Sequence, residues 1–216
     1  IIAKMPGIIV YAYQAKCHII ENQSMFIHPV RQKLSIAENI LALLRQDSYY
    51  TPQEAAILDL MLMLHADHGS GNNSTFTNIV VSSTGTDIYS CLSAGVGSLK
   101  GPRHGGANIT CRQQMKWVMH ELGMDATNNE MMTLINRMLA GDGFDDSKLI
   151  YGFGHAVYTL SDPRCELLKK HAYDLARQKG RTKEYEFYLR FETCVKAVFK
   201  HNKGRDICAN VDFYSG

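Results

Sequence analysis

Residues 101–108, GPRHGGAN, place a histidine between a Gly-Pro pair and a Gly-Gly pair. Glycine lets a ligand or another stretch of backbone approach closely, and proline fixes the direction of the chain. A helix is expected to begin at Gly106 or Ala107, and its positive end disfavours an imidazolium at His104. A neutral imidazole can donate a hydrogen bond to a developing oxyanion or enolate, so this loop predicts an electrophilic catalyst. A surface turn that contains a histidine is the alternative.

A second loop, YGFGHAVYTLSDPR at 151–164, joins His155 to an arginine nine residues later. Its glycines, Gly152 and Gly154, allow backbone N–H and C=O groups to meet a ligand directly. Arg164 offers a planar guanidinium that suits a carboxylate, and it stands where a helix is expected to begin. The loop therefore predicts an anion-binding site, with a purely structural turn as the alternative.

The segment NVDFYSG at 210–216 holds Asp212 between Val211 and Phe213. Apolar neighbours disfavour the ionised form of a carboxylate, which raises its pKa toward the range of a general base. An aspartate that caps a following helix gives the same pattern. Taken alone, the segment leaves both interpretations open.

Two histidines of HADH, His65 and His68, stand three residues apart, which is a spacing of two metal ligands on one helix face. A metal site needs a third ligand, and no residue of the sequence identifies one. The alternative is a buried helix with a polar C-terminal end, where a histidine suits the negative end of the helix dipole. We therefore expect neither a metal site nor a cofactor.

Composition excludes several classes of protein. The chain has 216 residues, of which 45% are hydrophobic, enough for one large core or two small ones. Its net charge of +2 comes from interleaved acids and bases, without the basic stripe typical of nucleic-acid binding. The longest apolar run, 55–64, is too short to span a bilayer, so no membrane partner is expected. The six cysteines form no CxxC pair, which favours a reducing compartment such as the cytoplasm.

Helix signals dominate the chain, and we predict a mainly α protein. Ser35-Ile36-Ala37-Glu38 has the form of a capping box and begins a helix of about three turns. Thr51-Pro52-Gln53-Glu54 begins another, which is apolar nearly all round and is expected to be buried between helices or subunits. Strand signals are limited to IIVYAY (8–13) and ICANVDF (207–213). The expected helices after residue 50 are 52–66, 74–84, 87–99, 107–122, 128–140, 163–179 and 184–201.

Four segments together resemble the citrate synthase family of the si-type, in the family's order and at about its spacings. They are HADHGSGNNSTFT (65–77), LKGPRHGGAN (99–108), YGFGHAVYTLSDPR (151–164) and NVDFYSG (210–216). The resemblance implies a multi-helical fold with a large and a smaller helical domain and the active site in the cleft between them. Residues 1–105 then belong to the large domain, and 106–216 mostly to the small one. Because the family's N-terminal region and its arginines downstream of Asp212 are missing, the chain resembles the middle half of a longer enzyme, a fragment.

The resemblance implies the condensation of acetyl-CoA with oxaloacetate to citrate and CoA, an acyl transfer of the tricarboxylic acid cycle. In this reaction His104 hydrogen-bonds the thioester carbonyl while Asp212 takes a proton from the methyl group. His155 polarises the ketone of oxaloacetate as the enol or enolate attacks, and citryl-CoA is then hydrolysed. Removal of a weakly acidic methyl proton needs both a base and an electrophile, so chemistry independently favours the pairing of Asp212 with a neutral His104.

Binding roles follow from the same resemblance. His68, Asn72 and Arg164 resemble the family's ligands of the oxaloacetate carboxylates, with Ser74 in the adjoining loop. The segment that lies against CoA corresponds to Leu149, Ile150, Tyr151, Gly152, Phe153 and Gly154. Thr159 replaces a cation that many bacterial members turn toward the CoA phosphates.

The resemblance also implies a homodimer, because the helices near 52–66, 163–179 and 184–201 resemble those that pack across the family's dimer. The composition leans toward a bacterial, cytoplasmic protein, and a eukaryotic member would belong to the mitochondrial matrix.

Three other functions remain open at this point. 2-Methylcitrate synthase shares these motifs and uses propionyl-CoA, whose extra methylene changes selectivity by only about 1–3 kcal/mol in a hydrophobic pocket. A catalytically silent helical dimerisation module is a second alternative, and a metal-dependent hydrolase built on His65 and His68 is a third. The joint presence of His104, His155 and Asp212 favours catalysis.

Overall fold

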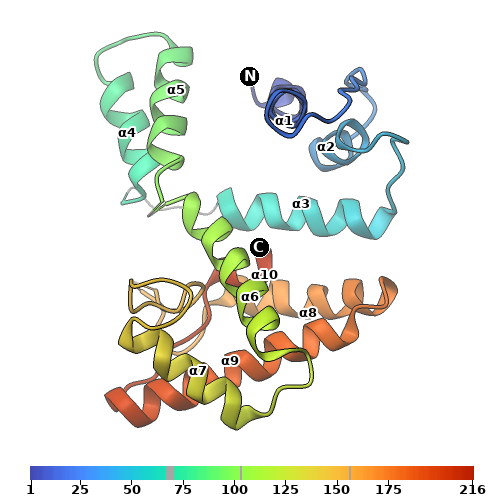
Figure 1. Ribbon diagram of the computed structural model, residues 1–216. Coiled ribbons are helices and arrows are strands. Elements are labelled where there is room, and N and C mark those ends of the chain that lie inside the picture. Colours follow the sequence, from blue (N-terminus) through green and yellow to red (C-terminus); the bar gives the residue numbers. More distant parts are fainter. Residues whose placement is uncertain (67–70, 103, 156) are drawn as a thin grey trace. The chain divides into compact units, whose positions relative to one another are not determined.

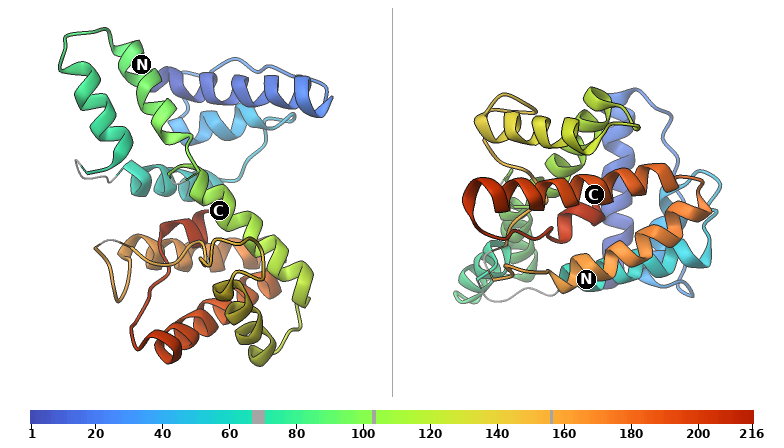
Figure 2. Two further views of the ribbon diagram at one scale, coloured as in Figure 1. Left: turned by 60° about the vertical axis from the view of Figure 1, so that its left-hand side comes forward. Right: turned by 90° about the horizontal axis from the view of Figure 1, so that it is seen from below.

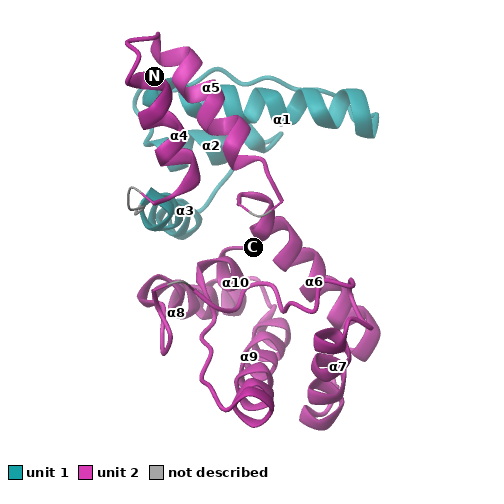
Figure 3. Cartoon of the chain, turned by 90° about the vertical axis from the view of Figure 1, so that its left-hand side faces the viewer, with its two compact units in different colours: residues 1–67 teal, residues 68–216 magenta. Residues whose placement is uncertain are grey.

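The computed structural model describes residues 1–66, 71–102, 104–155 and 157–216. The chain divides into two compact units, Ile1–Asp67 and His68–Gly216 (Figure 3). Helices make up the regular structure of the described residues, with one isolated β-bridge between Phe153 and Ala209. The mainly α prediction is confirmed.

The first unit contains a short 3-10 helix, η1, and three α-helices. They are η1 (Ile2–Lys4), α1 (Met5–Glu21), α2 (Ile36–Leu44) and α3 (Pro52–Ala66). The capping box that begins α2 is present, because Ser35 Oγ accepts a hydrogen bond from the Glu38 backbone N–H and the Glu38 carboxylate accepts one from the Ser35 backbone N–H. Thr51 and Glu54 make the same reciprocal pair at the start of α3.

Helix α1 overturns the reading of IIVYAY as a possible strand. The segment lies inside α1, where Val10, Gln14 and Cys17 are buried at the i, i+4, i+7 spacing of one helix face. β-Branched residues prefer strands only weakly, and burial of one helix face outweighs that preference. In ICANVDF, likewise, Ala209 alone pairs, and the side chain of Asn210 caps a helix that begins at the next residue.

Helix α3 is less buried than its apolar sequence predicts. Only Glu54 and Ala55 of this helix are buried, whereas 38% of Leu62 and 59% of Met63 remain exposed. Within its unit, α3 packs against α2. Within its own unit, α3 is therefore not buried as expected.

The second unit contains the remaining helices. The bounds of all but the last of them lie close to those expected from the sequence, which did not predict that last helix. These helices are α4 (Asn73–Ser82), α5 (Ile88–Leu99), α6 (Gly106–Leu122), α7 (Asn128–Ala140), α8 (Pro163–Gln178), α9 (Thr182–Lys203) and α10 (Val211–Ser215). Helices α4 and α5 pack side by side (Figures 1 and 2). Gly95 of α5 lies against the side chain of Asn78 of α4, because a Cβ on Gly95 would lie 2.2 Å from Asn78 Nδ2.

The core of the second unit is built around α9. Phe187, Phe191 and Val195 of this helix are fully buried, together with Met115 from α6 and Ile135 from α7. Helix α9 packs against α7 and α8, and the short helix α10 packs against α6 and α8 (Figure 1). This packing holds α10, which carries Asp212, against the core of the unit.

The predicted domain boundary near residue 105 falls between α5 and α6, inside the second compact unit. The division into 1–105 and 106–216 stays a prediction. No helix among the described residues is long and apolar enough to cross a membrane.

Candidate active site

His104 lies in the loop that connects α5 to α6. The loop folds back on itself, because the Gly105 N–H donates to Leu99 O at 2.8 Å and the Gly106 N–H to Gly101 O at 3.2 Å. A Cβ on Gly105 would lie 2.6 Å from Leu99 O, so this position needs glycine for the chain's own closure. Helix α6 begins at Gly106, as predicted, which places His104 next to the positive end of that helix.

The imidazole of His104 is held by a serine from α4. Its Nε2 lies 2.6 Å from Ser74 Oγ, a hydrogen bond between residues 30 apart in sequence. Ser74 is in the first turn of α4, which Asn72 caps by accepting a hydrogen bond from the Thr75 N–H at 3.1 Å. The bond fixes the direction of the His104 ring.

A hollow in the surface joins the His104 loop to the start of α4. It is lined by Asn72, Asn73, Ser98, Gly101, Pro102 and His104. The structure therefore brings two predicted site residues, Asn72 and His104, together. Ser98 Oγ is buried here and has no hydrogen-bond partner among the residues that the structure describes. His68, predicted beside them, lies outside the described residues.

His155 and Arg164, two residues of the predicted site, lie next to each other. An Arg164 guanidinium nitrogen lies 3.2 Å from His155 Nε2. The same guanidinium makes two hydrogen bonds to Asp162, at 3.1 and 2.9 Å, and Asp162 is completely buried. Burial acts to raise the pKa of the Asp162 carboxyl, but hydrogen bonds from the side chain and backbone of Arg164 outweigh it and lower that pKa. Asp162 therefore stays ionised and holds the arginine in place.

The hydrogen bonds of His155 determine what its ring can offer a ligand. Nδ1 accepts from the backbone N–H groups of Val157 at 3.0 Å and Tyr158 at 3.2 Å. In a neutral ring the proton is then on Nε2, which faces the guanidinium of Arg164. Both nitrogens are then donors, and an acceptor oxygen that contacts both of them, such as a ketone or carboxylate oxygen, suits this pair.

Asp212 lies in the first turn of α10. The cap of this helix is Asn210, whose Oδ1 accepts from the Asp212 N–H at 3.0 Å, so Asp212 is not itself the capping residue. The Asp212 carboxylate accepts a hydrogen bond from Asn108 Nδ2 of α6, with 3.3 Å between Nδ2 and Oδ1. Asn108 is four residues after His104, so the two predicted catalytic segments meet through this contact.

The expected CoA segment, 149–154, already has many of its backbone groups bonded within the protein. Gln114 bonds both the N–H and the C=O of Tyr151, at 2.9 and 3.1 Å. Gly152 O accepts from the Asn210 N–H, and the Gly154 N–H donates to Cys208 O. Ile150 is buried in the core, whereas 57% of Leu149 is exposed. The role of this segment in CoA binding stays a prediction.

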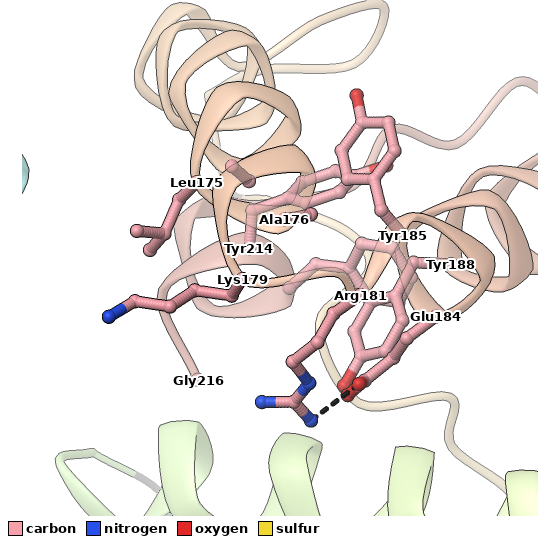
Figure 4. Close-up of a pocket in the computed structure, with 11 residues that line it drawn as sticks. Leu175, Ala176, Lys179, Arg181, Glu184, Tyr185, Tyr188, Tyr214 and Gly216 are labelled. Atoms are coloured by element: carbon pink, nitrogen blue, oxygen red, sulfur yellow. Dashed lines mark ion pairs between the residues drawn. The ribbon is translucent and has the colours of Figure 1, made fainter.

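A hollow of about 260 Å³ adjoins α10 on the side of α8 and α9. Tyr185, Tyr188 and Tyr214 line it, and the ion pair between Arg181 and Glu184 lies at its edge (Figure 4). None of the residues predicted from the sequence lines this hollow. It borders the helix of Asp212 without forming part of the candidate site.

A buried carboxylate on α9 supports α10. Glu192, only 2% exposed, accepts hydrogen bonds from Lys169 at 2.8 Å, from Lys196, and from the Tyr214 hydroxyl at 2.8 Å. Burial acts to raise the pKa of Glu192, but the hydrogen bonds from these three partners outweigh it and lower that pKa. Since Tyr214 stands two residues after Asp212, the charged form of Glu192 helps to hold α10.

Replacing Glu192 with glutamine should destabilise the protein in a pH-dependent way. The lowered pKa in the folded state means that ionised Glu192 stabilises the fold at any pH above its unfolded value of about 4.3. This contribution is lost as pH falls through the lower, folded value. At pH 7 we expect the variant to lose about 1–3 kcal/mol, the range for a hydrogen-bonded charged group.

Urea unfolding of the wild type and Glu192→Gln at pH 7 and at acid pH measures this effect. The difference in free energy of unfolding between the two proteins should shrink as the pH falls below the pKa of free glutamate. The exposed Glu186 of the same helix provides the control, Glu186→Gln, which should change little at either pH. An equal loss for Glu192→Gln at both pH values would contradict the assignment of the stabilisation to the ionised carboxylate.

Sequence reasoning missed the residues that hold the predicted ones. Ser74 was placed only in an adjoining loop, and Asn108, Asp162 and Asn210 were given no role. The signal for Asn108 and Asn210 was their place inside the motifs GGAN and NVDF. Glu192 gave no signal, because an acid among lysines on a helix has the pattern of a solvated surface.

Comparison with known proteins finds one family over the whole chain. The family model "Citrate synthase, C-terminal domain" matches residues 1–216. Citrate synthase of Deinococcus radiodurans is 38% identical over 186 residues, which cover 86% of this chain and 45% of that protein. 2-Methylcitrate synthase 2 of Corynebacterium glutamicum is 32% identical over 186 residues, with 84% and 44% covered.

A solved structure shares the fold. It is the ternary complex of citrate synthase from the thermophilic archaeon Thermoplasma acidophilum with carboxymethyl coenzyme A and oxaloacetate. The TM-score is 0.73 at 28% identity, over 100% of this chain and 51% of that one. The chain spans about half the length of the curated relatives it matches. By the family model and by these similarities, the chain belongs to the citrate synthase family.

Proposed function

We propose that the protein containing this chain condenses acetyl-CoA with oxaloacetate to give citrate and CoA. One observation carries the proposal: the contact between Asn108 and Asp212 joins the segment of the candidate electrophile to that of the candidate base across 104 residues of sequence. Proton abstraction next to a thioester carbonyl requires a base and a hydrogen-bond donor in the same site. The Thermoplasma acidophilum relative, solved with a CoA analogue and oxaloacetate, supports this substrate pair.

In the proposed reaction, Asp212 removes a proton from the methyl group of acetyl-CoA. The electron pair of the broken C–H bond delocalises onto the thioester oxygen, where His104 donates a hydrogen bond. The methylene carbon then attacks the ketone carbon of oxaloacetate, and the ketone oxygen takes a proton from His155 Nε2. Water cleaves the thioester of citryl-CoA, which releases citrate and CoA.

Substrate positioning is assigned to the neighbouring polar groups. Arg164, held by Asp162, is proposed to bind a carboxylate of oxaloacetate, and its guanidinium lies beside His155 as that role needs. Asn72 and His68 complete the proposed oxaloacetate site. Residues 149–154 are the proposed CoA segment, and no cofactor or metal is needed for the steps above.

We also propose that the protein is a homodimer. Among the helices expected at the interface, α9 buries its apolar side chains in its own unit, whereas α3 leaves Leu62 and Met63 exposed. Helix α4 exposes Phe76, Ile79 and Val80. Apolar side chains exposed on adjacent turns support a contact with another copy. Six buried free thiols support a reducing compartment such as the cytoplasm.

The direct test is CoA release by the complete protein. With acetyl-CoA and oxaloacetate, free thiol should accumulate and citrate should be identified by mass. Without oxaloacetate, no thiol should appear. Faster release with propionyl-CoA would instead assign the protein to 2-methylcitrate synthesis, in line with its Corynebacterium glutamicum relative.

The two remaining alternatives predict different results. A silent dimerisation module would form dimers and release no CoA with either acyl-CoA. A metal-dependent hydrolase would lose its activity on treatment with a chelator. Among the described residues, no three His, Cys, Asp or Glu side chains form a group that could hold a metal ion, and His65 Nδ1 lies 2.8 Å from Met61 O.

A further inference from the structure

The last residue of GPRHGGAN contacts the carboxylate of Asp212. Asn108 Nδ2 lies 3.3 Å from Asp212 Oδ1 and 2.8 Å from Ser215 Oγ. An ionised carboxylate accepts hydrogen bonds and donates none, so the amide must present its NH₂ group to Asp212. The second bond, to Ser215, holds the amide in that orientation.

The two oxygens of Asp212 differ in their surroundings. Oδ1 accepts from Asn108, whereas Oδ2 has no hydrogen-bond partner within the part of the chain that the structure describes. A carboxylate with one oxygen bound and the other open has a defined proton-accepting atom. Protonation at Oδ2 leaves Oδ1 as the carbonyl oxygen, which still accepts the bond from Asn108.

Asn108 also connects Asp212 to the loop of His104. It stands in the first turn of α6, where the Ala107 N–H donates to His104 O at 3.0 Å. On the other side, Asn210 binds the Asp212 N–H and donates to Gly154 O at 3.0 Å, in the loop that leads to His155. The base is therefore tied to both histidine loops by an asparagine on each side.

We propose that Asn108 is a positioning residue for the base of the reaction. It holds Asp212 Oδ1 so that Oδ2 meets the methyl group, and it sets the distance between that oxygen and His104. In the step that it supports, a C–H bond of the methyl group breaks, an O–H bond forms at Oδ2, and the electron pair moves to the thioester oxygen. This inference rests on the proposed function.

The test compares Asn108→Leu with Gln113→Leu in the complete protein. Leucine has nearly the shape of asparagine and lacks the donor, and Gln113 is an exposed amide of the same helix. We expect Asn108→Leu to lower kcat about 10- to 100-fold, the size of effect that a misplaced reacting group produces. The KM for oxaloacetate should change less than twofold, and Gln113→Leu should behave as the wild type.

A kinetic isotope effect separates positioning from a general structural role. With acetyl-CoA deuterated at the methyl group, the isotope effect on kcat should rise in Asn108→Leu, because proton transfer becomes more rate-limiting. A variant that merely loses folded protein has a lower rate and the wild-type isotope effect. Wild-type kcat in Asn108→Leu, or a lower kcat with an unchanged isotope effect, would overturn the inference while the proposed function stands.

A second variant covers the case in which Asn108→Leu does not fold. Ser215→Ala removes the other partner of the amide and should give a smaller loss of kcat with a raised isotope effect. Unchanged kinetics in Ser215→Ala would then overturn the inference. A wild-type protein without condensation activity would overturn the proposed function and this inference together.

Discussion

Replacing Asp212 with asparagine is expected to lower kcat by at least about a hundredfold, the lower end for loss of a general base. Asparagine cannot take the methyl proton. It keeps the size of the side chain and an oxygen that accepts the bond from Asn108, so α10 should stay in place. Turnover is measured as CoA release at saturating acetyl-CoA and oxaloacetate.

The fold of Asp212→Asn is checked by circular dichroism and urea unfolding. A matched control is Asp206→Asn, an exposed aspartate that pairs with Lys200 at the surface. It should keep wild-type turnover. Near-normal turnover in Asp212→Asn would show that this residue is not the base of the reaction.

Replacing Gly152 with alanine is expected to damage both stability and activity. Gly152 has φ +85°, a conformation that side chains disfavour by about 1–2 kcal/mol. A Cβ there would also lie 2.6 Å from Cys111 Sγ and 3.0 Å from Phe213 Cδ2. Such overpacking costs about 1–3 kcal/mol more, and it pushes against the helix that carries Asp212.

Gly180→Ala separates the two causes. Gly180 has φ +66° and no atom within 4 Å of the Cβ position, so alanine there meets the backbone penalty alone. Urea unfolding should show a larger loss for Gly152→Ala than for Gly180→Ala, and only Gly152→Ala should lower kcat. Equal losses in the two variants would contradict the close packing between the Gly152 loop and α10.

Helix starts were predictable where side chains cap them. The Ser35–Glu38 and Thr51–Glu54 pairs fix α2 and α3 through bonds within four residues, which a sequence displays directly. Helix α1 was missed, because its apolar residues include β-branched ones and it has no side-chain cap. Its burial against α2 determines the helix, and a linear sequence does not display that contact.

The candidate site likewise contains residues that the sequence predicts and residues that it does not. Motif chemistry selected His104, His155, Arg164 and Asp212 as candidates, and the structure places His155 next to Arg164. Their supporting residues depend on contacts over long separations, such as the 30 residues between Ser74 and His104. Only the fold brings such pairs together.

The structure of the complete protein with oxaloacetate and a non-reactive analogue of acetyl-CoA tests the central claim most directly. It should place the carbon that replaces the methyl group about 3–3.5 Å from Asp212 Oδ2, the range of a reactive contact. The oxygen that replaces the thioester carbonyl should lie within hydrogen-bond distance of His104. An analogue bound with neither atom near these side chains would contradict the pairing of Asp212 as base with His104 as electrophile.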